Sequence, residues 1–230
     1  MRLTILDAAA PDQPFPPSSA ALKEPNGLLA VGGCLSTKRL LNAYRHGVFP
    51  WYNPGDPILW WSPNPRLVLF PDKLSVSRSL KKTLRKKTFT FSFDKAFDAV
   101  VDNCAGIRKE GSGTWITSEI KRAFKQLHRL GHAHSIETWS DGELVGGLYG
   151  IAVGRVFFGE SMFHKKTDAS KVAFVTLVEL LSRWNYRLID CQVQTAHLES
   201  LGAQLIDRDE FEFLLDRFCD DPPSPCAWRC

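Results

Sequence analysis

The order of extended and helical patterns in residues 132–194 constrains the fold of this chain more than any other feature. The segments are extended over 132–139, 143–151 and 156–163, helical over 169–184 and extended again over 187–194. Asp141-Gly142 joins the first two strands as a hairpin turn. Three antiparallel strands, a crossover helix and a strand parallel to the third predict an α+β fold, in which a mixed sheet is flanked by helices on both sides.

The last of these strands carries a pair of candidate site residues. Alternate residues of an extended chain face opposite sides, which puts Asp190 and Gln192 together on the polar side. The apolar side, which can pack under a helix, consists of Ile189, Cys191 and Val193. A carboxylate beside a carboxamide on a sheet is typical of the floor of a site. An edge strand with its polar side in water is the alternative that this pattern leaves open.

The strand before the crossover helix holds an acid among apolar residues. Glu160 and Met162 share one side of this strand, and Phe158 precedes them on that side. Such a combination favours a pocket that holds an apolar side chain and an amino group together. A core acid in a salt bridge is the alternative.

The same order of strands, helix and strand occurs in acyl-CoA acetyltransferases, so the sequence predicts an acetyltransferase-like (GNAT-like) sheet. Those enzymes have a glycine-rich loop at the start of the crossover helix, where backbone N–H groups bind pyrophosphate. The corresponding segment here, His164–Lys171, contains no glycine. Coenzyme A binding of that kind is therefore disfavoured, and no cofactor is expected.

Residues 1–70 predict a small N-terminal domain rich in proline, glycine and tryptophan. Residues 11–35 predict irregular but packed turns, and Ser36 is expected to cap a helix over 37–46. Residues 48–66 hold five prolines and three of the seven tryptophans, which excludes a helix there. Such a stiff aromatic loop either fills a core or stacks on a planar ligand.

A basic helix follows a predicted strand over 67–70. Ser77 is its expected cap, and residues 78–87 carry six positive charges and no acid. The basic residues are Arg78, Lys81, Lys82, Arg85, Lys86 and Lys87. Because no acid relieves their repulsion, they predict a surface for an anionic partner, most simply a phosphate backbone. An idle solvated face is the alternative.

Local signals predict the remaining elements and the domain limits. Three further helices are expected, over 95–103 after Asp94, over 118–130 after the cap Thr117, and from the capping box Asp207–Glu210 to Phe218. Residues 71–219 are expected to form one larger domain that includes the basic helix. The proline-rich tail, residues 220–230, is expected to be only loosely held.

Composition and sequence pattern argue against several classes of protein. Apolar residues make up 44% of the chain and the net charge is +4, both ordinary for a globular protein. No export signal or membrane-spanning run is found, so a cytoplasmic protein with reduced cysteines is expected. His132 and His134 share a strand side without a third ligand, which favours a structural role over a metal site. Cys34 has no evident base and is not expected to be a nucleophile.

Eight spaced segments resemble leucyl/phenylalanyl-tRNA–protein transferase, in the right order, from about residue 12 to residue 219. They are Pro25-Asn-Gly-Leu-Leu-Ala-Val-Gly-Gly33, Gly47-Val-Phe-Pro-Trp51, Trp60-Trp-Ser-Pro-Asn-Pro-Arg66, Gly113-Thr-Trp-Ile116, Gly131-His-Ala-His-Ser-Ile-Glu137, Gly159-Glu-Ser-Met-Phe163, Ala169-Ser-Lys171 and Leu188-Ile-Asp-Cys-Gln192. The tail lies outside the resemblance.

The resemblance implies an enzyme that moves leucine or phenylalanine, and less well methionine, from aminoacyl-tRNA to a protein. The acceptor would be the α-amino group of an N-terminal Arg or Lys, and the product would be a degradation signal. Asp190 and Gln192 match the family's catalytic pair, and the pocket pattern adds Glu160 to them. Trp51 and Trp115 match aromatics near the terminal adenosine. The matching side-chain pocket consists of Leu148, Phe157, Met162, Phe174, Leu177 and Ile189, and the basic helix matches a tRNA-binding region.

Two departures from the family pattern bear on substrate preference. Many members have methionine where this chain has Leu148, and an aromatic residue is familiar where it has Leu177, so the balance of leucine and phenylalanine stays open. The expected mechanism has Asp190 bonding the NH₂ group of Gln192, whose carbonyl then orients the attacking amine. A monomer is expected. An acyl-CoA-dependent N-acetyltransferase and a non-catalytic tRNA-binding module are the alternative functions.

Overall fold

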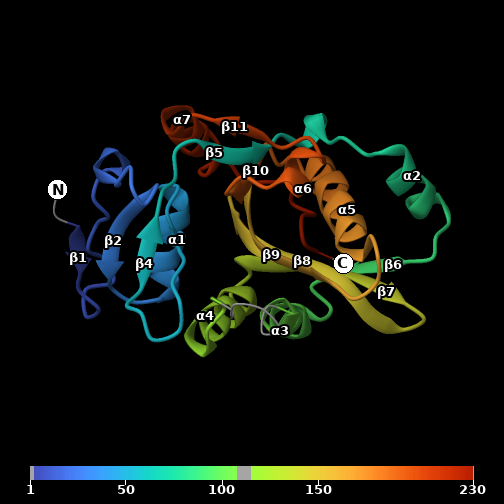
Figure 1. The fold of residues 1–230 in the computed structure, drawn as a ribbon, viewed down its shortest axis with the longest axis horizontal. Coiled ribbons are helices and arrows are strands. Elements are labelled where there is room, and N and C mark those ends of the chain that lie inside the picture. Colours follow the sequence, from blue (N-terminus) through green and yellow to red (C-terminus); the bar gives the residue numbers. More distant parts are fainter. Residues whose placement is uncertain (1–2, 108–114, 230) are drawn as a thin grey trace.

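The computed structural model describes residues 3–107 and 115–229, and its strands form two sheets (Figure 1). The smaller sheet consists of β1 (Thr4–Leu6), β2 (Leu28–Gly32), β3 (Phe49–Pro50) and β4 (Leu59–Trp61), in the order β1-β2-β4-β3. The expectation of irregular chain over 11–35 is therefore wrong for β2. Of the aromatic segment 48–66, Trp60 is fully buried and donates its Nε1–H to the carbonyl of Gly32, so this tryptophan belongs to the core.

The larger sheet confirms the predicted α+β fold. Its strands are β5 (Arg66–Leu69), β6 (Thr90–Phe93), β7 (Ala133–Ser140), β8 (Glu143–Val153), β9 (Val156–His164), β10 (Leu188–Gln192) and β11 (Gln204–Ile206). They are ordered β11-β5-β10-β9-β8-β7-β6. Only β9 and β10 pair in parallel, as expected for strands joined by a crossover helix. The limits 1–70 and 71–219 stay a prediction, and β5 from the first segment pairs within this sheet.

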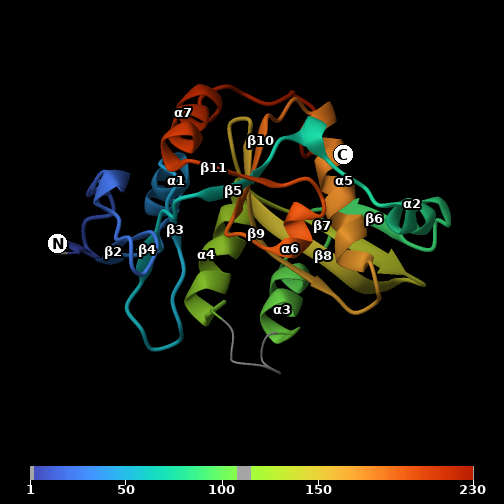
Figure 2. The ribbon, with the colours of Figure 1, turned by 45° about the horizontal axis from the view of Figure 1, so that its top comes forward.

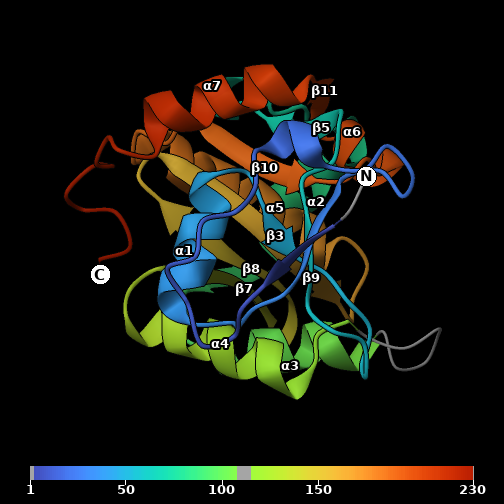
Figure 3. The ribbon, with the colours of Figure 1, turned by 90° about the vertical axis from the view of Figure 1, so that its left-hand side faces the viewer.

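Helices cover both sides of the larger sheet (Figures 1 and 2). They are α1 (Thr37–Arg45), α2 (Arg78–Arg85), α3 (Phe97–Ile107), α4 (Ser118–Arg129), α5 (Ala169–Arg183), α6 (Ala196–Glu199) and α7 (Arg208–Phe218), with short 3-10 turns at Ser18–Ala20 and Pro71–Lys73. The crossover helix α5 packs on one side and α3 and α4 on the other, which gives two apolar core layers. Seen from the small sheet, α1 lies between α7 and α4 (Figure 3).

The predicted helix caps are confirmed at three helices and wrong at two. Ser36, Ser77 and Thr117 accept hydrogen bonds from the first turns of α1, α2 and α4. Asp94 does not open α3, because its carboxylate binds the backbone N–H of Ser135 and the ring of His134 instead. Asp207 makes no side-chain cap at α7. Gly111 and Gly113 lie outside the described residues, and so does the start of the family-like segment that begins at Gly113.

Two strand irregularities lie side by side where β9 and β10 meet. In β9, Gly159 pairs with Gly150 and Ser161 with Tyr149, so Glu160 is an extra residue. In β10, Asp190 pairs with Val68 and Gln192 with Leu67, so Cys191 is extra. Bulges of this kind redirect side chains and are common beside active sites.

The two strands stop pairing at these bulges. Their ladder joins Leu188–Asp190 to Val156–Phe158 and goes no further. The bulge in β9 also changes which residues share a side, so Phe157 and Met162 face α5 while Phe158 packs in the opposite layer against Tyr44. The expectation that Phe158 shares a side with Met162 is therefore wrong, whereas Phe158 and Glu160 both contact Tyr44.

Neither a membrane span nor a metal cluster is found in the described parts of the chain. None of the helices in residues 3–107 and 115–229 combines the length and apolar character needed to cross a bilayer. Over the same ranges, no three His, Cys, Asp or Glu side chains gather as a metal-binding group.

Candidate active site

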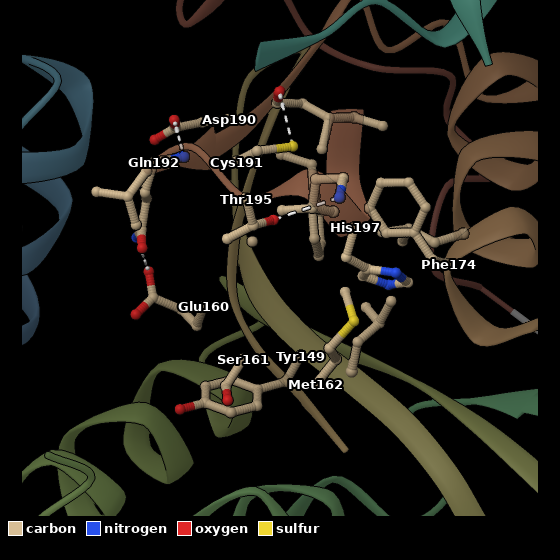
Figure 4. Close-up of a pocket in the computed structure, with 17 residues that line it drawn as sticks. Tyr149, Glu160, Ser161, Met162, Phe174, Asp190, Cys191, Gln192, Thr195 and His197 are labelled. Carbon is tan, nitrogen blue, oxygen red and sulfur yellow. Dashed lines mark hydrogen bonds between the residues drawn. The ribbon is translucent and has the colours of Figure 1, made fainter. Parts of the chain in front are cut away.

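A pocket of about 280 Å³ opens between β9 and β10, where the two strands have separated. Both strands and α5 form its walls, and α6 follows β10 at one side (Figure 4). Its lining residues are Leu148, Tyr149, Phe157, Gly159, Glu160, Ser161, Met162, Phe174, Leu177, Ile189, Asp190, Cys191, Gln192, Val193, Thr195, His197 and Leu198. The pocket is mainly apolar, with its carboxylates and its carboxamide at one end.

The pocket brings together nine residues that the sequence singled out. They are the proposed pocket residues Leu148, Phe157, Met162, Phe174, Leu177 and Ile189 and the proposed catalytic residues Glu160, Asp190 and Gln192. Trp51 and Trp115 are not among the lining residues. Trp51 is 44% exposed and lies against Trp61, with ring centroids 5.8 Å apart. The roles of all these residues stay predictions.

Glu160 is the central polar group of the pocket. Its Oε1 accepts hydrogen bonds from the Tyr44 hydroxyl at 2.8 Å and from Gln192 Nε2 at 3.0 Å. Its Oε2 is buried and has no partner among the described residues. An unpartnered buried carboxyl oxygen is costly, so this atom is a candidate for binding a polar group of a substrate.

Burial raises the pKa of Glu160 to about 8, and the Asp190 carboxylate adds to this rise. The hydrogen bonds from Tyr44 and Gln192 and the positive charge of Arg66 act in the opposite direction. Burial and the same Glu160 carboxylate raise the pKa of Tyr44 well above its usual range, so this hydroxyl stays a donor. Glu160 is therefore largely protonated at neutral pH, and its proton is lost near pH 8.

Asp190 forms a buried ion pair with Arg66, the first residue of β5. Asp190 Oδ1 accepts from Arg66 Nε at 2.8 Å and Oδ2 from Nη2 at 2.7 Å, and both residues are at most 1% exposed. The Arg66 guanidinium also lies between the rings of Phe49 and Phe211, 4.7 and 4.8 Å from their centroids. Both charges are thus compensated inside the protein.

The expected bond between Asp190 and the NH₂ group of Gln192 is wrong. That NH₂ group donates to Glu160, while Asp190 Oδ1 accepts from the backbone N–H of Gln192 at 2.9 Å. The reason is the bulge, because Gln192 has a left-handed backbone with φ of 63° and no longer continues the strand alternation. The sequence pattern placed the two residues together but could not show this turn of the chain.

The sequence reasoning missed two residues that organise the site. Tyr44 reaches Glu160 from α1, 116 residues away in sequence, and Arg66 reaches Asp190 across 124 residues. No pattern in the sequence around these residues indicates either contact. Arg66 does close the Trp60–Arg66 segment of the resemblance, which was the one available hint.

The opposite side of the pocket carries groups with shifted pKa values. Partial burial lowers the pKa of His197, and the nearby Lys171 and His164 lower it further, so its ring is neutral at pH 7. Burial raises the pKa of Cys191 well above its usual range, which makes the thiol a poor nucleophile. Figure 4 shows His197 beside Phe174, across the pocket from Glu160.

The basic helix is confirmed as α2, and its charges face solvent. Its four basic residues and the two lysines that follow it, Lys86 and Lys87, are all exposed, and none of these six forms an ion pair with any residue in the described ranges. By contrast, Lys121 and Lys125 of α4 pair with Asp102. The helix is joined to the start of α5 by a hydrogen bond of 3.2 Å from Thr83 to Asp168.

The start of α5 does not suit a pyrophosphate. Asp168, the residue before the helix, places its carboxylate there, where it accepts from Thr83 and pairs with Lys171 at 3.1 Å. A fixed negative charge at this helix terminus opposes an anionic ligand, in agreement with the absence of glycine. The acyl-CoA alternative is disfavoured on both grounds.

Comparison with known proteins gives consistent results over almost the whole chain. The family model described as leucyl/phenylalanyl-tRNA protein transferase matches residues 68–216, and that of the N-terminal domain of the same enzyme matches residues 33–64. A leucyl/phenylalanyl-tRNA–protein transferase of Methylococcus capsulatus is 59% identical over 227 residues, covering 99% of this chain and 97% of the relative. One from Azotobacter vinelandii is 59% identical over 215 residues, covering 93% and 94%.

A solved GCN5-related N-acetyltransferase from Kribbella flavida is similar with a TM-score of 0.39 and 13% identity. The similarity covers 70% of this chain and 58% of that one.

The buried ion pair leads to a prediction about stability. Replacing Arg66 by alanine leaves the Asp190 carboxylate buried without a counter-charge, so the free energy of unfolding should fall by about 3–5 kcal/mol. Urea unfolding followed by circular dichroism measures the change. Lys38→Ala breaks the exposed pair with Asp12 and serves as the control, with an expected loss below about 1 kcal/mol. Equal losses in the two variants would contradict the central role of the buried pair.

Proposed function

Because this chain belongs to the leucyl/phenylalanyl-tRNA–protein transferase family, we propose that it moves leucine, phenylalanine and, less well, methionine from aminoacyl-tRNA to an N-terminal Arg or Lys. Family membership makes it an aminoacyltransferase that acts on an aminoacyl-tRNA and a protein. The choice of acceptor residue and the resulting degradation signal rest on the family resemblance. The reaction would take place in the cytoplasm, where charged tRNA is made.

The observation that carries the proposal is the apolar pocket ending at the unpartnered Oε2 of Glu160. The aminoacyl side chain would lie among Phe157, Met162 and Phe174, with its ester carbon near the polar end. The acceptor amine would donate a hydrogen bond to Glu160 Oε2. Holding an amine and an ester in this arrangement converts a bimolecular reaction into an effectively unimolecular one.

The chemistry needs little activation, because the aminoacyl ester is already a reactive acyl donor. The neutral amine attacks the ester carbonyl carbon, a C–N bond forms, and the bond to the ribose oxygen breaks. The amine proton passes to Glu160, whose pKa of about 8 is close to the ~7.7–8.0 of a peptide α-amino group, and from Glu160 to the departing ribose oxygen, which leaves as a hydroxyl group. Gln192 would position Glu160 through its NH₂ group, and Asp190 would hold the bulge that presents Gln192.

The proposal is tested by mass spectrometry of an acceptor peptide. The protein is incubated separately with Leu-, Phe- and Met-tRNA and a peptide that begins with Arg. We expect a mass gain of one residue with each donor, smallest with Met-tRNA, and none when the peptide N-terminus is acetylated. A peptide that begins with Lys should also react, and one that begins with Glu should not. No mass gain from any charged tRNA would overturn the proposal.

Replacing Glu160 by glutamine should change both the rate and its pH dependence. Loss of a positioned base should lower kcat/KM for the acceptor peptide by roughly 10²-fold. Between pH 6 and 7.5 the wild type must lose two protons, one from Glu160 and one from the amine, so the slope of log kcat/KM against pH should approach about two. The variant should keep only the slope of about one that the amine gives.

Tyr44→Phe is the matched control for that experiment. It removes a hydrogen bond that lowers the pKa of Glu160, so the rise in rate should move to higher pH while the steep slope remains. A wild-type slope of about one, unchanged in the glutamine variant, would remove Glu160 from the proton transfer.

The exposed charges of α2 should bind tRNA. Reversing Lys81 and Lys82 to glutamate should raise KM for aminoacyl-tRNA about tenfold or more at low salt and weaken its dependence on salt, because fewer counterions are released. Reversing Arg122 and Arg129 on α4 gives the same change in net charge on the opposite side of the sheet and should leave KM nearly unchanged. Equal effects of the two reversals on KM would show that α2 has no specific role in tRNA binding.

A further inference from the structure

The C-terminal tail ends in an aromatic anchor, contrary to the expectation that it is only loosely held. The ring of Trp228 stacks on His134 with centroids 4.0 Å apart and lies 4.8 Å from the ring of Trp184. Its Nε1–H donates to the Tyr186 hydroxyl at 2.8 Å. These partners come from β7, the end of α5 and the chain before β10, so the partly buried Trp228 packs against the core layer beneath α5.

Trp228 also stacks on Phe157, a residue of the pocket wall. The two ring centroids are 5.8 Å apart with an interplanar angle of 29°. Phe157 is fully buried and lines the pocket, so its ring has the pocket on one side and Trp228 on another.

The backbone of β8 confines the same ring from a third direction. A Cβ atom on Gly150 would lie 2.5 Å from Phe157 Cε1, so the ring rests directly against this glycine. With Gly150 beneath it and Trp228 behind it, the ring cannot retreat from the pocket. The position of Phe157, and with it the depth of the pocket, therefore depends on Trp228.

We infer that Trp228 is a specificity-determining residue that fixes the depth of the aminoacyl side-chain pocket by supporting Phe157. The inference rests on the proposed function, since it concerns the choice between donor side chains. Trp228 does not touch the pocket itself and acts as a positioning residue. A shallow pocket favours leucine, and a ring free to move back would make room for the longer phenylalanine side chain.

The tail has attachments that do not involve the indole. Arg155 pairs with Asp221 at 2.9 Å, and the backbone N–H of Ser224 donates to the carbonyl of Trp184 at 2.9 Å. The tail can therefore keep its course when the ring is removed. A change in specificity then reports on the ring rather than on detachment of the whole segment.

The test measures kcat/KM for Leu-tRNA and for Phe-tRNA with the full-length protein and a peptide that begins with Arg. Trp228→Ala should raise the Phe-to-Leu ratio about tenfold, the lower end of the roughly 10–200-fold effect of one methylene group in an apolar pocket. Trp228→Phe should restore most of the wild-type ratio. Tyr186→Phe removes only the acceptor of the Trp228 N–H and should leave the ratio unchanged.

Leu127→Ala separates specificity from general loss of stability. Leu127 is a fully buried residue of α4 in the other core layer, and its removal should lower the melting temperature without moving the Phe-to-Leu ratio. In addition, Phe157→Leu should abolish the effect of Trp228→Ala on the ratio, because Trp228 acts through that ring.

Two outcomes would overturn the inference. One is an unchanged ratio in Trp228→Ala, with both donors slowed equally. The other is an effect of Trp228→Ala that persists in full when Phe157 is already leucine. If Trp228→Ala does not fold, Trp228→Phe and Trp228→Leu form the graded series, and equal ratios across it would also overturn the inference. Failure of the wild-type protein to transfer either residue would instead refute the proposed function.

Discussion

The ion pair between Arg66 and Asp190 is the interaction on which the rest of the site depends. It is bidentate and buried, and Phe49 and Phe211 cover the guanidinium from two sides. These four residues come from β5, β10, the small sheet and α7, so a single cation joins four parts of the chain. A buried charge pair is costly to assemble, and its desolvation is repaid only when every partner is in place. The pair thus favours one arrangement of the two sheets over looser ones.

That arrangement also explains the shape of the pocket. Asp190 lies at the last ladder position that β10 shares with β9, and its Oδ1 accepts from the backbone of Gln192 beyond the bulge. The carboxylate therefore stabilises a left-handed residue that the strand itself disfavours. Past this point the strands separate, and the bulge in β9 turns Glu160 toward Gln192. Apolar side chains from α5 line the opening between the strands, which gives a pocket with one polar end.

The periodicity of apolar residues and the turn motifs were enough to predict the strands and the helix from β7 to β10. They also predicted that Glu160, Asp190 and Gln192 lie in one site. They could not predict the bulges, because one inserted residue changes the side of every residue after it, as shown by Phe157 and Met162, which share a side although Glu160 is inserted between them. Nor could they predict the contacts of Tyr44 and Arg66, which join residues more than 100 positions apart. The strands of the small sheet are two to five residues long and lie between segments that contain glycine and proline, so their local signal resembles that of turns.

The hydrogen bond from Tyr44 to Glu160 links the small N-terminal unit to the central acid of the pocket. Burial alone would hold the Glu160 proton more tightly, and the hydrogen bonds from Tyr44 and Gln192 bring its pKa back to about 8. A proton moves between two groups of nearly equal pKa at little cost in free energy, and an α-amino group has such a pKa. On the proposed mechanism, α1 must therefore dock against β9 for Glu160 to match its substrate. The base is tuned by a residue from outside the sheet that carries it, which is a physical reason for the two units to fold against each other.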